Sequence, residues 1–452
     1  MKRNYKTLII VTIGILLCIG VSAGSYALWI NSQKQQSQNK IIGACLNVIL
    51  KDADAAKKGM TFDNAWPVSD FEGMQLEGYK FTVTNSCDEP IDYRIDLNSL
   101  EIDQANYMSN SSVAVLLDYG VKTIYEELTS EKTTKPGIRE KKILGYDTVM
   151  GNSTNTHTIR MWIDESVKKE EQNKSFLSKI EVNAGQGYKK YYTEESCFTI
   201  TEAGVIKAYD VNCGGTDVVI PYEINGITVK EINSLAFSTK GLTSIELPRS
   251  VTRLSTGAFM GNLTLEKIVL KDGLTHITSS VFANTTYKTS SLKFIAIPET
   301  VISIGQDAFS NNEIEQVVLP DSVTSIGTLA FGDNAIKHLK IGSGLTTIAN
   351  NAFRNNKIEK LEIPDNITTI GSNAFASNSL TEVHLGKGLT TIQTKAFYMN
   401  PTLKFLEIPR NVVSIAEDGI SLSEGSIIIV KKLKREANFS EGWGGYAQIF
   451  YE

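Results

Sequence analysis

The second half of the chain repeats one pattern of apolar and polar positions about every 22 residues. A phenylalanine marks each copy, and consecutive phenylalanines lie 22, 23, 27, 22, 22, 22 and 22 residues apart. They are Phe237, Phe259, Phe282, Phe309, Phe331, Phe353, Phe375 and Phe397. A period of this length predicts a solenoid, in which no copy can bury its apolar face alone and stacked copies share one core.

One copy, residues 363–385, shows how the pattern predicts local structure. Pro364 ends a strand because it cannot donate to a hydrogen-bonded ladder, and Ile367 and Ile370 are apolar positions three residues apart. We expect Phe375 in a short helical turn, followed by a half-buried strand in which Val383 and Leu385 alternate with polar residues. Stacking such strands builds a parallel sheet, and the spacing of 27 carries an extra polar segment, TYKTSS.

An asparagine recurs three residues after the phenylalanine. It stands at Asn262, Asn312, Asn334, Asn356, Asn378 and Asn400. Asparagine tolerates the left-handed backbone conformation that closes a helical turn. We therefore interpret it as a C-cap residue.

Two of these units, VVLPDSVTSIGTLAFGDNAI and LEIPDNITTIGSNAFASNSL, resemble the BspA-type leucine-rich repeat. The resemblance covers about residues 218–430, with departures at Val281 and at Gly419 and Ile420. It implies a mostly β solenoid with a curved parallel sheet and short helical turns. It also implies extracytoplasmic binding, often surface adhesion, with no catalytic residues.

Residues 31–190 lack the repeat and show short alternating runs at 79–85, 91–97, 112–118, 157–164 and 178–184. Such runs predict an antiparallel β-sandwich. The motifs GSYALW, PVSDFEG, FTVTNSC and RMWIDES resemble the camelysin/TasA-type family of exported β-sandwich proteins. This resemblance implies a surface or matrix module that assembles into fibres by sharing strands.

Two flanking segments are expected to cap the solenoid. Residues 191–217 alternate like a hairpin and predict an N-terminal cap. Residues 431–452 predict a C-terminal cap, in which Trp443, Tyr446 and Ile449 cover the last layer.

The N-terminus reads as a targeting segment. Lys2, Arg3 and Lys6 precede an apolar run, and Ser25-Tyr26-Ala27 fits a cleavage site after Ala27, so residues 1–27 are predicted to be a signal peptide. Residues 8–30 are also long enough to remain as a membrane anchor. Both alternatives place the rest of the chain outside the cytoplasm, either secreted or associated with the cell surface.

Export makes disulfides chemically favourable. Apart from Cys18 in the apolar run, the chain has four cysteines, which allow three pairings. The pairs Cys45 with Cys87 and Cys197 with Cys213 keep each bridge within one predicted domain, so we favour them.

The net charge and the absence of known catalytic motifs exclude several classes of function. The formal net charge is −5, so nothing favours a nucleic-acid partner. The sequence contains no H-E-x-x-H, G-x-S-x-G, G-x-x-x-x-G-K or G-x-G-x-x-G, and we predict neither an enzyme nor a cofactor or metal site. His157 lies in a predicted strand, where a partly buried, hydrogen-bonded role outweighs a ligand role.

Function is therefore expected on the outward side of the repeat strands, where residues alternate with the buried ones. The candidate ligand-binding residues there are Phe294, His338, Lys340, Lys360, Glu362, His384 and Phe405. The sequence predicts a cell-surface protein that binds an extracellular protein or glycan, with self-association as a further partner and membrane contact only through an uncleaved 8–30. The alternative is a structural subunit of a surface fibre or biofilm matrix, assembled through the sandwich.

Overall fold

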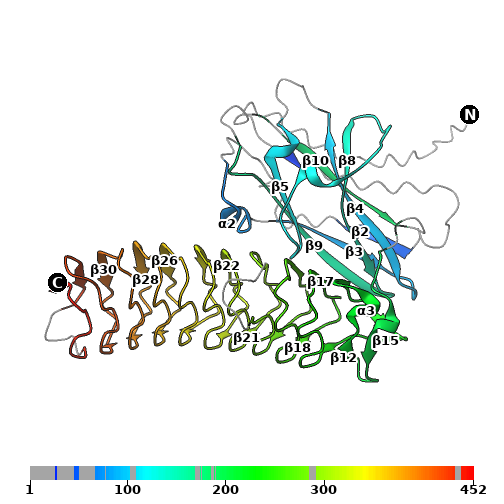
Figure 1. The fold of residues 1–452 in the computed structure, drawn as a ribbon. Coiled ribbons are helices and arrows are strands. Elements are labelled where there is room, and N and C mark those ends of the chain that lie inside the picture. Colours follow the sequence, from blue (N-terminus) through cyan, green and yellow to red (C-terminus); the bar gives the residue numbers. More distant parts are fainter. Residues whose placement is uncertain are drawn as a thin grey trace, which may run out of the picture.

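Two β-domains make up the chain, a sandwich followed by a solenoid (Figure 1). The computed structural model describes residues 26–27, 45–49, 67–76, 78–101, 108–167, 174, 176–184, 188, 190–284, 292–432 and 439–451. The predicted leader and anchor lie outside these residues apart from Tyr26 and Ala27, and so does TYKTSS. No helix in the described ranges is long and apolar enough to cross a bilayer.

The sandwich consists of two five-stranded sheets. The first has the order β1 (Tyr26–Ala27), β10 (Leu177–Ala184), β4 (Ile91–Leu100), β8 (Ile138–Val149), β7 (Thr129–Glu131). The second has the order β2 (Leu46–Ile49), β3 (Tyr79–Asn85), β9 (Ser153–Ile163), β5 (Val113–Leu117), β6 (Thr123–Ile124). Every pairing is antiparallel except β1 with β10. The predicted sandwich is confirmed, although strands β1, β2, β6, β7 and β8 lie outside the predicted runs.

Alternating residues of the sheets form the sandwich core. Phe81 and Val83 of β3 and Tyr93 and Ile95 of β4 are fully buried within it. A disulfide joins Cys45, beside β2, to Cys87, just after β3. One turn of helix, α2 (Asp70–Gly73), precedes β3, and short 3-10 helices lie at Asn110–Ser112 and Tyr125–Glu127.

The solenoid has two rows of parallel strands. The first row contains mostly two-residue strands: β12 (Val205–Tyr209), β16 (Glu231–Ile232), β18 (Arg253–Leu254), β20 (His276–Ile277), β21 (Ser303–Ile304), β23 (Ser325–Ile326), β25 (Thr347–Ile348), β27 (Thr369–Ile370), β29 (Thr391–Ile392) and β31 (Ser414–Ile415). The second, which we call the outward row, contains β13 (Asp217–Val219), β17 (Ser244–Glu246), β19 (Lys267–Val269), β22 (Gln316–Val318), β24 (His338–Lys340), β26 (Lys360–Ile363), β28 (Glu382–Leu385), β30 (Phe405–Ile408), β32 (Ile427–Val430) and β33 (Gln448–Tyr451).

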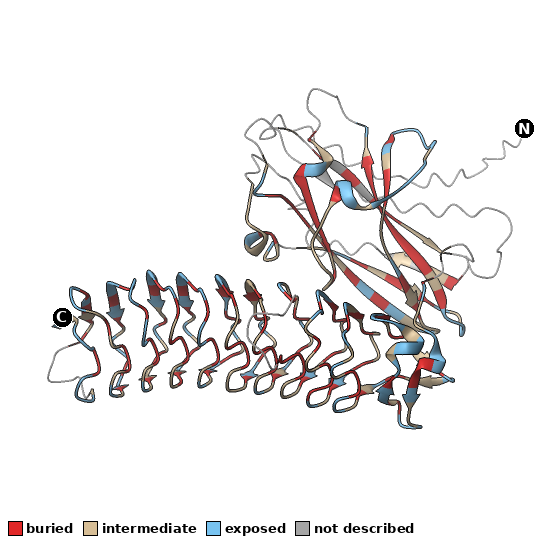
Figure 2. Ribbon diagram, viewed as in Figure 1, coloured by how far each residue is buried: buried red, intermediate tan, exposed pale blue. Residues whose placement is uncertain are grey.

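The recurring phenylalanines stack inside the solenoid. All eight are buried, and successive ring centroids are 5.0–5.8 Å apart at interplanar angles of 5–26°. The buried residues form a continuous stripe along the solenoid (Figure 2). Because burying one such side chain is worth about 1.5–3 kcal/mol, adjacent coils stabilise one another, as the repeat pattern predicts.

The recurring asparagine has a different role from the one predicted. Asn378 has no positive φ; the left-handed residues of that coil are Asn373 and Ser377. The Asn378 amide is buried and donates to the carbonyls of Phe353 and Phe375 at 3.0 and 3.1 Å. Its Oδ1 accepts from the Ile358 N–H at 3.1 Å. The C-cap interpretation is wrong, because the side chain satisfies backbone groups of two neighbouring coils.

Both ends of the solenoid are closed. At the N-terminal end, β11 (Phe198–Ile200) pairs antiparallel with β12, and the Cys197–Cys213 disulfide holds this hairpin to the short helix α3 (Val211–Gly214). A second hairpin, β14 (Glu223–Ile224) and β15 (Ile227–Thr228), follows. Both predicted disulfide pairings are therefore confirmed.

At the C-terminal end, only some of the residues predicted to cover the last layer of the solenoid do so. Trp443 is buried against the last coil and Ile449 packs beside it. Tyr446 is 84% exposed, so its predicted covering role is wrong. It lies in the turn that precedes β33 rather than in the strand.

Candidate functional site

The outward row presents alternate side chains to solvent. In β26 and β28 the burial alternates, so that Lys360, Glu362, Glu382 and His384 face outward while the residues between them enter the core. This follows from the period of two along a strand. Lys340 in β24 is exposed in the same way.

The part of this row from Lys340 to the C-terminal end, which we call the far half, contains a small cluster of charged side chains. Lys360 Nζ lies 3.4 Å from a Glu382 carboxylate oxygen, and His384 Nε2 lies 2.9 Å from the other. The hydrogen bond from His384, followed by that from Lys360, lowers the pKa of Glu382. Lys360 and His384 keep 78% and 73% of their side chains exposed, so they are accessible to a partner.

Apolar side chains continue the row towards the C-terminal end. Phe405 of β30 is 49% exposed and pairs in register with Ile427 of β32, which is 38% exposed. Phe450 of β33 is 52% exposed. Charged groups beside an exposed apolar patch are typical of interaction surfaces.

The sandwich covers the rest of the row, which we call the near half. Its elements lie over β17 and β22 (Figure 1). His338 stacks on Phe71 of α2, with ring centroids 5.2 Å apart. Phe294 is half-buried and belongs to no strand, because the outward row is interrupted between β19 and β22. The predicted candidates therefore do not form one uniform face.

A groove of about 360 Å³ lies between α2 and the interrupted part of the row. Phe294, His338 and Glu315 line the solenoid side, and Asp70 and Lys122 line the sandwich side. Lys122 Nζ bridges two carboxylates, Asp70 at 2.8 Å and Asp164 at 2.5 Å. The groove joins two of the predicted binding residues to a sandwich surface that sequence analysis did not implicate.

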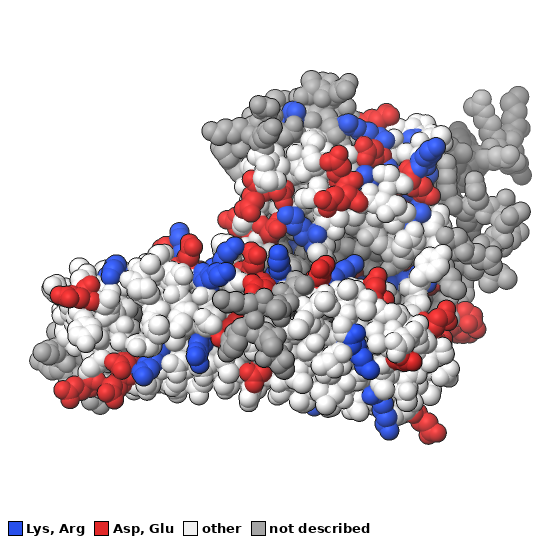
Figure 3. All heavy atoms as spheres, viewed as in Figure 1, with Lys and Arg blue, Asp and Glu red and all other residues white. Residues whose placement is uncertain are grey.

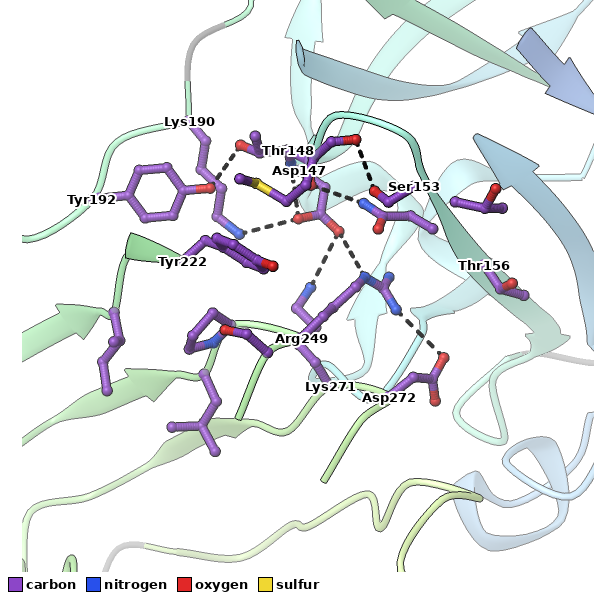
Figure 4. A pocket seen from close by; sticks show the side chains of 17 residues that line it. Asp147, Thr148, Ser153, Thr156, Lys190, Tyr192, Tyr222, Arg249, Lys271 and Asp272 are labelled. Carbon is purple, nitrogen blue, oxygen red and sulfur yellow. Dashed lines mark hydrogen bonds and ion pairs between the residues drawn. The ribbon is translucent and has the colours of Figure 1, made fainter. Parts of the chain in front are cut away.

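A buried charge network joins the two domains closer to the start of the solenoid (Figure 4). Asp147, on β8, is surrounded by Lys190, Arg249 and Lys271 at 3.7, 3.4 and 4.0 Å. Lys190 and Lys271 also contact Glu246 of β17, at 2.6 and 3.2 Å. Acidic and basic side chains gather along the angle between the domains (Figure 3).

The network continues into the sandwich core. Arg249 lies 3.2 Å from Asp118, which contacts His157 Nδ1 at 2.8 Å, while His157 Nε2 lies 2.6 Å from the Tyr93 hydroxyl. His157 is thus buried and hydrogen-bonded, as its position in a strand predicted.

The pKa shifts show that the network favours charged carboxylates. Burial alone raises the pKa of Asp118, but His157 and Arg249 outweigh it and bring the value down to about 2. Lys271 and Lys190 likewise lower the pKa of Asp147 and of Glu246 against the effect of burial. Charges buried with such partners hold surfaces together, and removing one partner is costly.

Sequence reasoning missed this network, although a signal was present. Arg249 follows Pro248 at a position where other copies of the repeat carry Asp321 and Asp365. Lys271 stands where most copies have proline. These basic residues depart from the consensus in two adjacent coils, but Arg410 and Lys431 depart in the same way where no domain docks, so the sequence signal alone does not locate the junction.

Clusters of three or more potential metal-binding side chains are absent from the described part of the chain. The predicted cleavage position, Ala27, lies in β1, and the structure describes only its backbone pairing with Ser178.

Comparison with known proteins identifies a family of repeats that part of this chain matches. Residues 211–336 and 302–423 match the BspA type leucine rich repeat region, in six copies. The predicted resemblance of the repeats is therefore confirmed. The match lies outside the sandwich, so the camelysin/TasA-like resemblance stays a prediction. No curated protein matches the chain.

Several solved structures are similar. A leucine-rich repeat protein from T. pallidum is 29% identical, with 43% of this chain and 81% of that chain covered and a TM-score of 0.32. One from Bacteroides ovatus is 17% identical, with 59% and 99% covered and a TM-score of 0.32. The pneumococcal vaccine antigen PcpA is 20% identical, with 50% and 72% covered and a TM-score of 0.28.

Proposed function

We propose that this protein is an exported bacterial surface protein that binds an extracellular protein or glycan through the far half of the outward row. The observation that supports this most directly is the run of exposed side chains at Lys340, Lys360, Glu362, His384 and Phe405 on successive parallel strands of the outward row. Strand-borne side chains are held in fixed relative positions, which lowers the entropic cost of binding.

The chemistry of this row suits a partner with mixed polarity. The Lys360–Glu382–His384 cluster offers both signs of charge, and Phe405 with Ile427 offers apolar area for an anchor. The groove beside Phe294 and His338 would receive the inner end of an extended ligand. Aromatic and charged residues at the centre of an interface usually carry most of its energy.

Export is proposed from the sequence and is consistent with the two disulfides. Both bridges, Cys45–Cys87 and Cys197–Cys213, close within single domains. Disulfides persist in oxidising compartments and are rare in the bacterial cytosol. Whether residues 1–27 are cleaved or residues 8–30 anchor the chain is decided by N-terminal sequencing of protein from its native culture.

Binding is tested with the purified protein on arrays of extracellular-matrix proteins and surface glycans. We expect a specific ligand whose binding falls at least about tenfold in a variant carrying His384→Ala and Phe405→Ala, because an anchor and a polar contact are lost. A matched variant carrying Tyr446→Ala and Val413→Ala, both exposed outside the row, should bind normally. Equal binding by both variants would refute the assignment of the face.

The alternative, a subunit of a surface fibre, has one observation in its favour. β1 is a two-residue parallel strand added beside β10, in a sheet that is otherwise antiparallel. Cleavage after Ala27 would remove β1 and leave β10 as a free edge, and a free edge can accept a strand from another copy.

Electron microscopy compares the full chain with a chain that begins at Leu28. Filaments formed only by the shorter chain would support strand sharing. Monomers of the shorter chain at high concentration would count against the fibre alternative and leave the binding proposal intact.

A further inference from the structure

A cavity of about 330 Å³ lies beside the buried charge network, at the near end of the outward row. Its walls come from the β8–β9 hairpin and residues 190–192 on one side and from the first coils of the solenoid on the other. Figure 4 shows Asp147 at the centre of the lining side chains, with the Tyr222 hydroxyl pointing towards it. Pockets of this size are at the small end of ligand-binding sites.

Each charged side chain around this cavity is already paired with an opposite charge. Lys190, Arg249 and Lys271 face the carboxylates of Asp118, Asp147, Glu246 and Asp272, and every member has an opposite charge within 4.0 Å. A charged ligand would have to break one of these buried pairs, which is costly. The lining therefore favours a ligand without net charge.

Several polar and aromatic groups in the cavity remain available. Among the described residues, the Ser250 Oγ is the cavity's buried hydroxyl without a hydrogen-bond partner, while the hydroxyls of half-buried Tyr222 and exposed Thr156 are free to bind a ligand or water. A buried hydroxyl without a partner costs free energy, so it indicates a missing ligand or water. The ring of Tyr222 adds an apolar surface with a polar tip.

We propose that this cavity binds a neutral saccharide unit. A sugar hydroxyl donates and accepts at once, so it can bridge a carboxylate such as Asp147 and an ammonium such as Lys190 without changing their charges. The carbon face of the ring would pack on Tyr222, and its remaining hydroxyls would meet Thr156 and Ser250. This site is separate from the proposed binding face, so each can fail without the other.

The test titrates the purified full chain with glucose, galactose, mannose, N-acetylglucosamine and cellobiose, using isothermal calorimetry and ligand-observed NMR. Glucuronic acid is the charged comparison. We expect at least one neutral sugar to bind with a Kd of about 1 mM or tighter, and glucuronic acid to bind at least about tenfold more weakly. No neutral sugar binding at that level, or stronger binding of glucuronic acid, would overturn the proposal.

Variants locate the site. Tyr222→Ala should weaken sugar binding about tenfold, while Tyr446→Ala, at an exposed tyrosine on the far end of the solenoid, should leave it unchanged. Thr156→Val keeps the shape and removes one hydroxyl, so it should weaken binding several-fold in a protein that stays folded. Unchanged binding in Thr156→Val and Tyr222→Phe together would place the sugar elsewhere and overturn the proposal.

Discussion

The near and far halves of the outward row are built on the same repeat and behave differently. In the near half, Lys190 and Lys271 contact Glu246 with at most 22% of any of these side chains exposed. In the far half, Lys360 and His384 contact Glu382 with 47–78% exposed. The two ionic clusters have similar members, but only the near cluster is covered by another domain.

This difference shows how a repeat separates stability from function. The stacked phenylalanines and the buried recurring asparagines stabilise the core along the solenoid in both halves. Outward positions are therefore free to vary, because they are not needed for folding. In the near half, the outward residues contact the sandwich. In the far half, they remain exposed and accessible to a partner.

The largest expected effect tests whether the core is alike beneath both halves. Phe259→Ala and Phe375→Ala should each destabilise the protein by about 3–5 kcal/mol, because each opens a large cavity in the ring stack. Denaturant unfolding followed by circular dichroism measures both. A loss confined to one of the two variants would show that the coils do not share one continuous core.

A matched pair of arginines tests the difference at the surface. Arg249 is held in the junction and Arg410 occupies the same position of a later repeat, where it is exposed. Arg249→Ala should cost about 3 kcal/mol, since it leaves Asp118 and Asp147 short of a buried cation. Arg410→Ala should leave the free energy of unfolding unchanged within error. Similar effects of the two substitutions would contradict a junction held by charge.

Acid should weaken the junction. The folded pKa of Asp118 is about 2, below its ordinary 3.8. The ionised group therefore contributes about 2 kcal/mol above about pH 4, and this contribution is lost as the pH falls through 2. Asp147 shifts in the same direction, whereas burial raises the pKa of Asp272 and opposes the trend.

Unfolding of the wild type and of Asp118→Asn between pH 5 and pH 2 measures this contribution. The wild type should lose stability more steeply than the variant over that interval. Parallel pH profiles would remove Asp118 from the network.

The smallest effect is expected in the far half. Lys360→Ala removes one partner of Glu382, but exposed ion pairs contribute little to folding because water screens them. Thermal unfolding should give the same midpoint as the wild type. A clear drop would mean that the far cluster is structural, and it would weaken the proposal that this half serves binding.

Local pattern was sufficient to predict the solenoid, its buried phenylalanines and both disulfides. Each of these depends on periodicity or on cysteines within one domain. The role of Asn378 was not predictable in this way, because its hydrogen bonds reach the backbone of the preceding coil as well as its own turn.

Contacts between the domains were also beyond the reach of pattern. Arg249 and Asp147 are 102 positions apart in the sequence and meet only when the sandwich docks on the solenoid. The same docking brings Phe71 onto His338 and divides the predicted binding row. No periodic signal in either segment encodes such a pairing.

The junction is closed to solvent while the far half of the outward row is open. Amine labelling of the native protein, followed by mass spectrometry, measures this directly. Lys190 and Lys271, 10% and 9% exposed, should react far more slowly than Lys360, and Arg249→Ala should speed their labelling. Equal labelling rates for the three lysines in the wild type would contradict the claim.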